Sequence, residues 1–221
     1  YQGVPFRNTG DPVLHLSNPP GVTQETQGAT LRAIRDLNEQ HYATEGDLEI
    51  ASRIASYELA FRMQSAAPEL LDFRDETPQT LEMYGVNNET TKEFGANCLL
   101  ARRMVERGVR FVQLFHASWD DHQKLNEGLE KNCGITDKPT AALLKDLKQR
   151  GLLEDTMVIW GGEFGRTPLV EARSEDQSTW GRDHHPNAFS LWLAGGGIKS
   201  GQVVGETDSI GLEILRDPVN V

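Results

Sequence analysis

The sequence predicts an α/β fold with a mostly parallel sheet flanked by helices. Runs of β-branched and aromatic residues alternate with segments whose apolar residues recur at helical spacing. Three polar clusters also lie beside the β-rich runs. Because open α/β sheets bind ligands outside the carboxyl ends of their strands, we expect these clusters to converge on one site.

The first two helices are predicted from apolar spacing. Residues 1–24 are expected to form an extended segment, because proline, glycine, asparagine and serine are frequent there. A helix is expected at about 25–41, and a stronger amphipathic pattern starts at residue 47. The apolar positions of that pattern are Ile50, Ile54, Tyr57 and Phe61.

Two further helices are expected after an irregular connection at 66–88, which carries two prolines and many acidic residues. The first is predicted to end at Gly108. The second is predicted from Asp137 to Arg150, with Pro139 in its first turn. The apolar positions of the first are Phe94, Cys98, Ala101 and Val105.

Three segments have the composition of sheet strands. Residues 109–115 interleave β-branched and aromatic residues with polar ones, and residues 156–160 form a short apolar run. Residues 188–194 are expected to form a third strand, followed by a turn at the glycines 195–197. Helices and strands therefore alternate along one expected domain of 221 residues.

Composition excludes some partners and leaves location open. The net charge of −11 opposes binding to nucleic acid or to an anionic membrane surface, and no apolar run is long enough to span a bilayer. The two cysteines are too few for a disulfide framework. The chain starts without an initiator methionine or an export signal and ends without closing an element. It therefore reads as an incomplete domain of a longer protein, and periplasmic export of that protein stays open.

The first polar cluster is Trp119-Asp120-Asp121-His122. Asp120 and His122 are two positions apart, so on an extended segment their side chains project to the same side, while Asp121 faces away. A carboxylate with an imidazole suits zinc, iron or manganese. The alternative is a solvated loop with a helix-capping aspartate.

The second cluster runs from Gly162 to Pro168. Its glycines allow a tight turn beside the Glu163 carboxylate, and Arg166 is placed to hold an anionic oxygen pair. An internal ion pair between Glu163 and Arg166 is the competing interpretation.

The third cluster contains Arg182, Asp183, His184 and His185. Adjacent residues of an extended chain point to opposite sides, so at most two of the last three serve one metal easily. His184 is favoured as a ligand, and Asp183 as a ligand or as a residue that orients a histidine. The alternative is a polar loop with solvent-exposed histidines.

At these clusters the sequence resembles the DUF1501 family of the sulfatase and alkaline phosphatase-like superfamily. The resemblance covers nearly the whole chain and includes Tyr57-Glu58-Leu59-Ala60, Cys98-Leu99-Leu100-Ala101-Arg102-Arg103, the three clusters and Ala194-Gly195-Gly196-Gly197. It implies an alkaline phosphatase-like fold with a two-metal site at the carboxyl edge of a mostly parallel sheet. The implied ligands of the first metal are Asp120, His122 and His184 or His185, and Glu163 is implied for the second.

The same resemblance implies a metal-dependent hydrolase of sulfate or phosphate esters, small molecules or saccharides. Its divalent metal is zinc, calcium, manganese or iron, Arg166 or Arg182 holds the nonbridging oxygens, and the nucleophile lies upstream of this chain. Two departures from the superfamily pattern weaken the two-metal expectation: Glu163-Phe164 replaces an Asp-His pair, and the spacing of Asp120 and His122 is tighter. A non-catalytic metal-binding scaffold and a mononuclear metal esterase are the alternatives.

Overall fold

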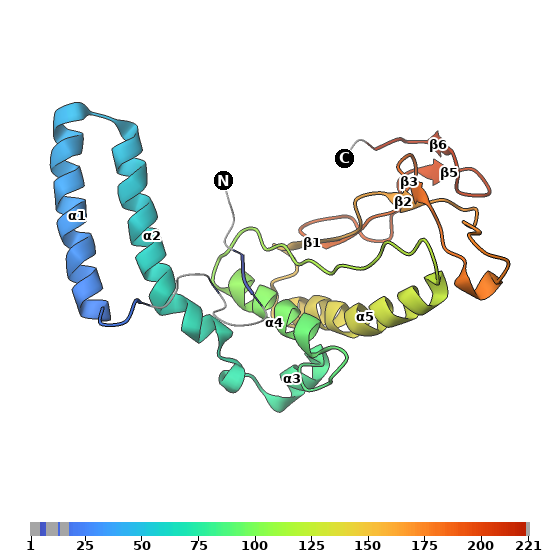
Figure 1. The fold of residues 1–221 in the computed structure, drawn as a ribbon, viewed down its shortest axis with the longest axis horizontal. Coiled ribbons are helices and arrows are strands. Elements are labelled where there is room, and N and C mark those ends of the chain that lie inside the picture. Colours follow the sequence, from blue (N-terminus) through green and yellow to red (C-terminus); the bar gives the residue numbers. More distant parts are fainter. Residues whose placement is uncertain (1–4, 8–12, 14–17, 220–221) are drawn as a thin grey trace. The chain divides into compact units, whose positions relative to one another are not determined.

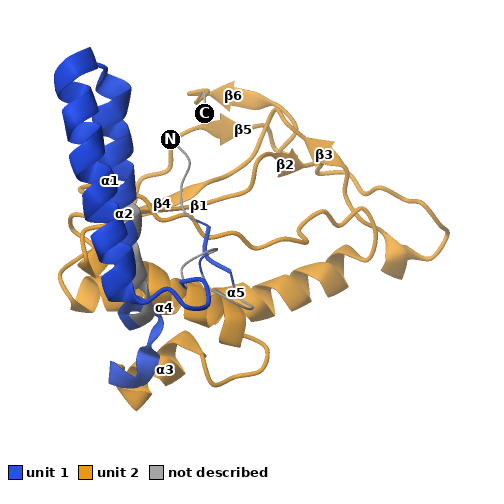
Figure 2. Ribbon diagram, turned by 60° about the vertical axis from the view of Figure 1, so that its left-hand side comes forward, with its two compact units in different colours: residues 1–75 blue, residues 76–221 orange. Residues whose placement is uncertain are grey.

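The computed structural model describes residues 5–7, 13 and 18–219, which form two compact units. Figure 2 colours the first unit, residues 1–75, and the second, residues 76–221. Most of the expected extended segment 1–24 lies outside the described residues. Within the described residues, no helix has the length and apolar composition required to cross a bilayer.

The first unit is a hairpin of two long helices, α1 (Gln24–Glu45) and α2 (Leu48–Leu71), followed by the 3₁₀ turn η1 (Phe73–Asp75) (Figure 1). The Thr23 hydroxyl caps α1 by accepting a hydrogen bond from the Thr26 amide, and Gly46 ends the helix in a left-handed conformation. Both predicted helices are therefore confirmed, although each extends further than expected.

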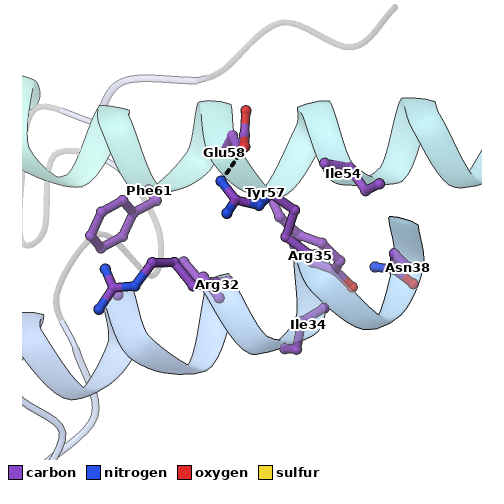
Figure 3. A pocket seen from close by; sticks show the side chains of 10 residues that line it. Arg32, Ile34, Arg35, Asn38, Ile54, Tyr57, Glu58 and Phe61 are labelled. Atoms are coloured by element: carbon purple, nitrogen blue, oxygen red, sulfur yellow. Dashed lines mark ion pairs between the residues drawn. The ribbon is translucent and has the colours of Figure 1, made fainter. Parts of the chain in front are cut away.

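A groove runs between the two helices of the hairpin (Figure 3). Its lining is mainly apolar, and the Arg35 guanidinium reaches across to the Glu58 carboxylate at 3.8 Å. Of the four apolar positions predicted for α2, Ile50 is buried, whereas Tyr57 remains about half exposed. The apolar face of α2 is thus only partly covered.

The second unit begins with a layer of three helices: α3 (Pro78–Tyr84), α4 (Lys92–Glu106) and α5 (Leu125–Gln149). The predicted helix before Gly108 is confirmed as α4. Its partner α5 starts earlier than expected, so Pro139 is buried inside the helix rather than in its first turn. The helices meet through buried apolar side chains that include Tyr84, Cys98, Leu99 and Leu147.

Charged side chains also lie in this helical layer. The Arg102 side chain, 3% exposed, contacts Glu76 at 2.6 Å, Glu106 at 2.6 Å and Asp146 at 3.0 Å. Burial lowers the pKa of Arg102, but its hydrogen bonds to Glu76 and Glu106 outweigh this effect, so the pKa is raised overall. The Tyr84 hydroxyl donates to Asp146 at 3.0 Å, which joins α3 to α5. The guanidinium of Arg102 therefore links α4 to α5 and to Glu76, which lies two residues before α3.

The strands of the second unit correct the predicted fold class. Within the described residues they form three antiparallel pairs: β1 (Met157–Trp160) with β4 (Trp192–Gly195), β2 (Gly165–Arg166) with β3 (His184–His185), and β5 (Glu206–Thr207) with β6 (Ile214–Arg216). The expected mostly parallel, alkaline phosphatase-like sheet is therefore wrong. A parallel pair needs a crossover connection, usually helical, and the chain between β1 and β4 contains only β2, β3 and the short 3₁₀ turn η2 (Gln177–Thr179).

Two segments differ from their predicted conformation. Residues 109–115 form no strand, and Phe111 and Phe115 are 91% and 78% exposed. Their alternating pattern satisfied the period of a strand, but no partner strand pairs with them among the described residues. The expected irregular connection at 66–88 instead contains the end of α2, η1 and α3.

We predict that Arg102→Met strongly destabilises the second unit. The substitution removes the cation that the buried Glu76 and Asp146 carboxylates share and leaves them with Arg103 and Arg150 as their remaining partners. The loss of this buried cation costs about 3 kcal/mol. Lys92→Met is the matched control on the same helix, because Lys92 pairs with Glu89 at an exposed site. Urea unfolding followed by circular dichroism measures both variants, and equal midpoints for the two would contradict a structural role for the Arg102 ion pairs.

Candidate metal centre

Three side chains from two distant segments converge on one point in the second unit. The Nε2 atoms of His122 and His184 are 3.2 Å apart, and Asp120 Oδ1 lies 3.1 Å from the first and 2.9 Å from the second. We refer to these residues as the Asp120–His122–His184 cluster. Its three donor atoms are close enough to share one metal ion.

Backbone pairing brings the two segments together. His184 lies on β3, opposite Arg166 of β2. The loop that carries Asp120 and His122 joins the chain before β3 through a bridge between Gln123 and Trp180. The Arg182 amide also donates to the Asp121 carbonyl at 3.1 Å. The cluster is therefore held by backbone hydrogen bonds on both sides.

Gly181 lies where these two segments approach most closely. A Cβ atom at this position would lie 2.2 Å from the His122 carbonyl carbon and 2.4 Å from the Asp121 carbonyl oxygen. Both are backbone atoms, which cannot rotate away as a side chain would. Only glycine therefore allows this approach without displacement of the backbone that carries His122.

Arg166 and Phe164 border the cluster. The Arg166 Nη1 donates to Asp120 Oδ1 at 2.6 Å, and its Nη2 donates to the Trp119 carbonyl at 3.3 Å. The Phe164 ring lies 4.5 Å from the His184 ring, and the Arg166 guanidinium carbon is 5.7 Å from the centre of the Phe164 ring. Arg166 thus pairs with Asp120, not with Glu163 as in the competing interpretation of the second cluster.

The protonation of the cluster follows from these contacts. Hydrogen bonds from His184 and Arg166 lower the pKa of Asp120 to about 2, so its carboxylate is ionised near neutral pH. Three lone-pair atoms facing one another at 2.9–3.2 Å repel unless a proton or a cation lies between them. The centre of the cluster therefore requires either a proton or a cation.

Glu171 is part of the site although sequence reasoning missed it. Its Oε2 lies 2.7 Å from His122 Nδ1, and both side chains are 23% exposed. Hydrogen bonds from His122 and Arg173 lower the pKa of Glu171. No local motif marks this residue, and its position follows only from the bridge between Glu171 and Gly181.

Other predicted site residues lie outside the Asp120–His122–His184 cluster. Glu163 is exposed and belongs neither to this cluster nor to the second possible donor group among the described residues, His122, Glu171 and Asp183. Asp183 Oδ1 is 3.9 Å from His122 Nδ1, on the side of Glu171. His185 is buried with its Nε2 2.8 Å from the Leu212 carbonyl oxygen, and Arg182 adjoins the site through its backbone. The structure therefore separates the adjacent histidines 184 and 185.

We predict that Gly181→Ala destabilises the protein by about 1–3 kcal/mol, because the new methyl group overlaps backbone atoms. Gly134→Ala is the control, since a Cβ there has no neighbouring atom within 4 Å and alanine favours the helix α5. The two substitutions should shift the urea midpoint in opposite directions. Unchanged stability of Gly181→Ala would contradict the close backbone approach.

Comparisons with other proteins identify the family of the chain. Searches of curated proteins and of solved structures found no match. One family model matches residues 1–221, and its description is "Protein of unknown function (DUF1501)". The chain thus belongs to the DUF1501 family.

Proposed function

We propose that the Asp120–His122–His184 cluster binds one divalent transition-metal ion and that this site hydrolyses sulfate or phosphate esters. The observation that carries the proposal is the convergence of two imidazole nitrogens and one carboxylate oxygen within 3.2 Å of one another. Two donors bound to one ion at about 2.0–2.1 Å lie roughly 2.8–3.4 Å apart for bond angles of about 90–109°. The donor distances in the cluster, 2.9–3.2 Å, lie within that range.

The donor types favour particular metals. Imidazole nitrogens suit zinc and iron, whereas calcium takes oxygen ligands almost exclusively. Of the metals expected from the sequence, zinc, iron and manganese thus fit better than calcium. A set of two histidines and one carboxylate also leaves coordination positions open, as a catalytic site requires.

The position of Arg166 favours an anionic substrate. Its guanidinium lies beside the cluster and has a planar set of donors that suits the nonbridging oxygens of a sulfate or phosphate group. Asp120 neutralises Arg166 in the free protein, and a substrate oxyanion would take over part of that pairing. A bound cation supplies Lewis-acid polarisation of an ester oxygen.

The first prediction concerns metal content. Wild-type protein dialysed against zinc and then buffer should retain about one ion per chain, and His184→Ala or Asp120→Ala should lose most of it. Glu163→Ala is the control, because Glu163 lies outside the cluster. Elemental analysis gives the stoichiometry. Full retention by His184→Ala, or loss only in Glu163→Ala, would show that the ligands are assigned wrongly.

The second prediction concerns turnover. Arg166→Met should reduce kcat/KM for aryl sulfate or aryl phosphate esters by about 100-fold or more, because it removes a charge-assisted contact to the developing anion. Arg216→Met is the control: it removes an exposed guanidinium that pairs with Glu206 and with none of the cluster residues. If the wild type retains metal but hydrolyses neither ester, the protein is a non-catalytic metal-binding member of the family.

A further inference from the structure

His122 has a different partner at each ring nitrogen. Its Nδ1 faces Glu171 Oε2 at 2.7 Å, and its Nε2 faces His184 Nε2 at 3.2 Å and Asp120 Oδ1 at 3.1 Å. A neutral imidazole carries one proton, so only one of these nitrogens is a donor and the other offers its lone pair. The partner at Nδ1 therefore decides whether Nε2 directs an N–H group or a lone pair toward His184 and Asp120.

Glu171 is the closer carboxylate: its Oε2 lies 2.7 Å from Nδ1, whereas Asp120 Oδ1 lies 3.1 Å from Nε2 and already accepts a hydrogen bond from Arg166. An ionised carboxylate only accepts hydrogen bonds, so a neutral His122 that bonds to Glu171 carries its proton on Nδ1. Its Nε2 lone pair then points toward His184 and Asp120. In the free protein, a proton on His184 Nε2 completes the contact, because this nitrogen lies within hydrogen-bond distance of both residues.

The Glu171 carboxylate is itself held in place. Arg173 contacts its second oxygen, Oε1, at 2.5 Å, which leaves Oε2 directed to His122. The Glu171 amide donates to the Gly181 carbonyl at 2.8 Å, so its backbone is tied to the segment that packs against His122. Side chain and backbone thus fix Glu171 from two directions.

We propose that Glu171 is a positioning residue that sets the Nδ1–H tautomer of His122 and thereby makes Nε2 a metal ligand. The inference deepens the proposed function, because the effect on metal affinity rests on the metal site. The effect on the tautomer does not, since it is a property of the free protein. A carboxylate behind a ligating histidine typically changes metal affinity by about 10- to 100-fold.

The first measurement uses the metal-free chain. Nitrogen-15 NMR of the histidine rings should show His122 protonated at Nδ1 in the wild type and shifted toward the Nε2–H tautomer in Glu171→Ala. Glu171→Gln should retain the Nδ1–H form, because the amide oxygen still accepts a hydrogen bond. Glu175→Ala is the matched control: it removes an exposed carboxylate from the same segment. An Nε2–H tautomer in the wild type, or an unchanged tautomer in Glu171→Ala, would overturn the proposal.

The second measurement is zinc affinity by chelator competition. Glu171→Ala should bind zinc about 10- to 100-fold more weakly than the wild type, with Glu171→Gln between them and Glu175→Ala unchanged. Equal affinity of Glu171→Ala and Glu175→Ala would refute the role of Glu171 in metal binding. If the wild type binds no zinc, the proposed function fails, and the NMR measurement still decides the role of Glu171 in fixing the tautomer.

Discussion

The close backbone approach at Gly181 is the constraint on which the candidate site depends. His122 and His184 are 62 positions apart in the sequence, and their rings meet because the chain at 180–182 packs directly against the chain at 121–123. Any residue larger than glycine at position 181 would push the backbone segments 180–182 and 121–123 apart. A donor distance of about 3 Å therefore depends on a residue with no side chain and no chemical role of its own.

The helical layer holds these two backbone segments in place. α5 begins just after His122, and the amides of Lys124 and Leu125 donate to carbonyl oxygens of the 179–180 segment. α5 is in turn joined to α4 through the buried ion pair between Arg102 and Asp146. Buried pairs of this kind are costly to disrupt, whereas the exposed contacts of Asp120 leave that carboxylate free to exchange partners. The site thus combines a rigid support with adaptable ligands.

Sequence periodicity predicted the helices better than the sheet. The spacing of Phe94, Cys98 and Ala101 reflects burial on one helix, which neighbouring residues decide. A strand depends on a distant partner, so the alternation at 109–115 and the apolar run at 156–160 contained no information about pairing or direction. The parallel sheet was wrong for this reason. Nothing in the local sequence distinguishes a strand that pairs antiparallel from one that pairs parallel.

The same distinction applies to the site. Asp120, His122 and His184 were found from short motifs, and the structure places them together. Glu163 was expected as a ligand from a family resemblance, but the carboxylate beside His122 is that of Glu171. Backbone pairing between Glu171 and Gly181 places it there. X-ray absorption spectroscopy of the zinc-loaded protein reports which atoms bind the metal. We expect two imidazole nitrogens and one carboxylate oxygen at about 2.0–2.1 Å. A zinc environment without imidazole, or one with sulfur, would contradict it.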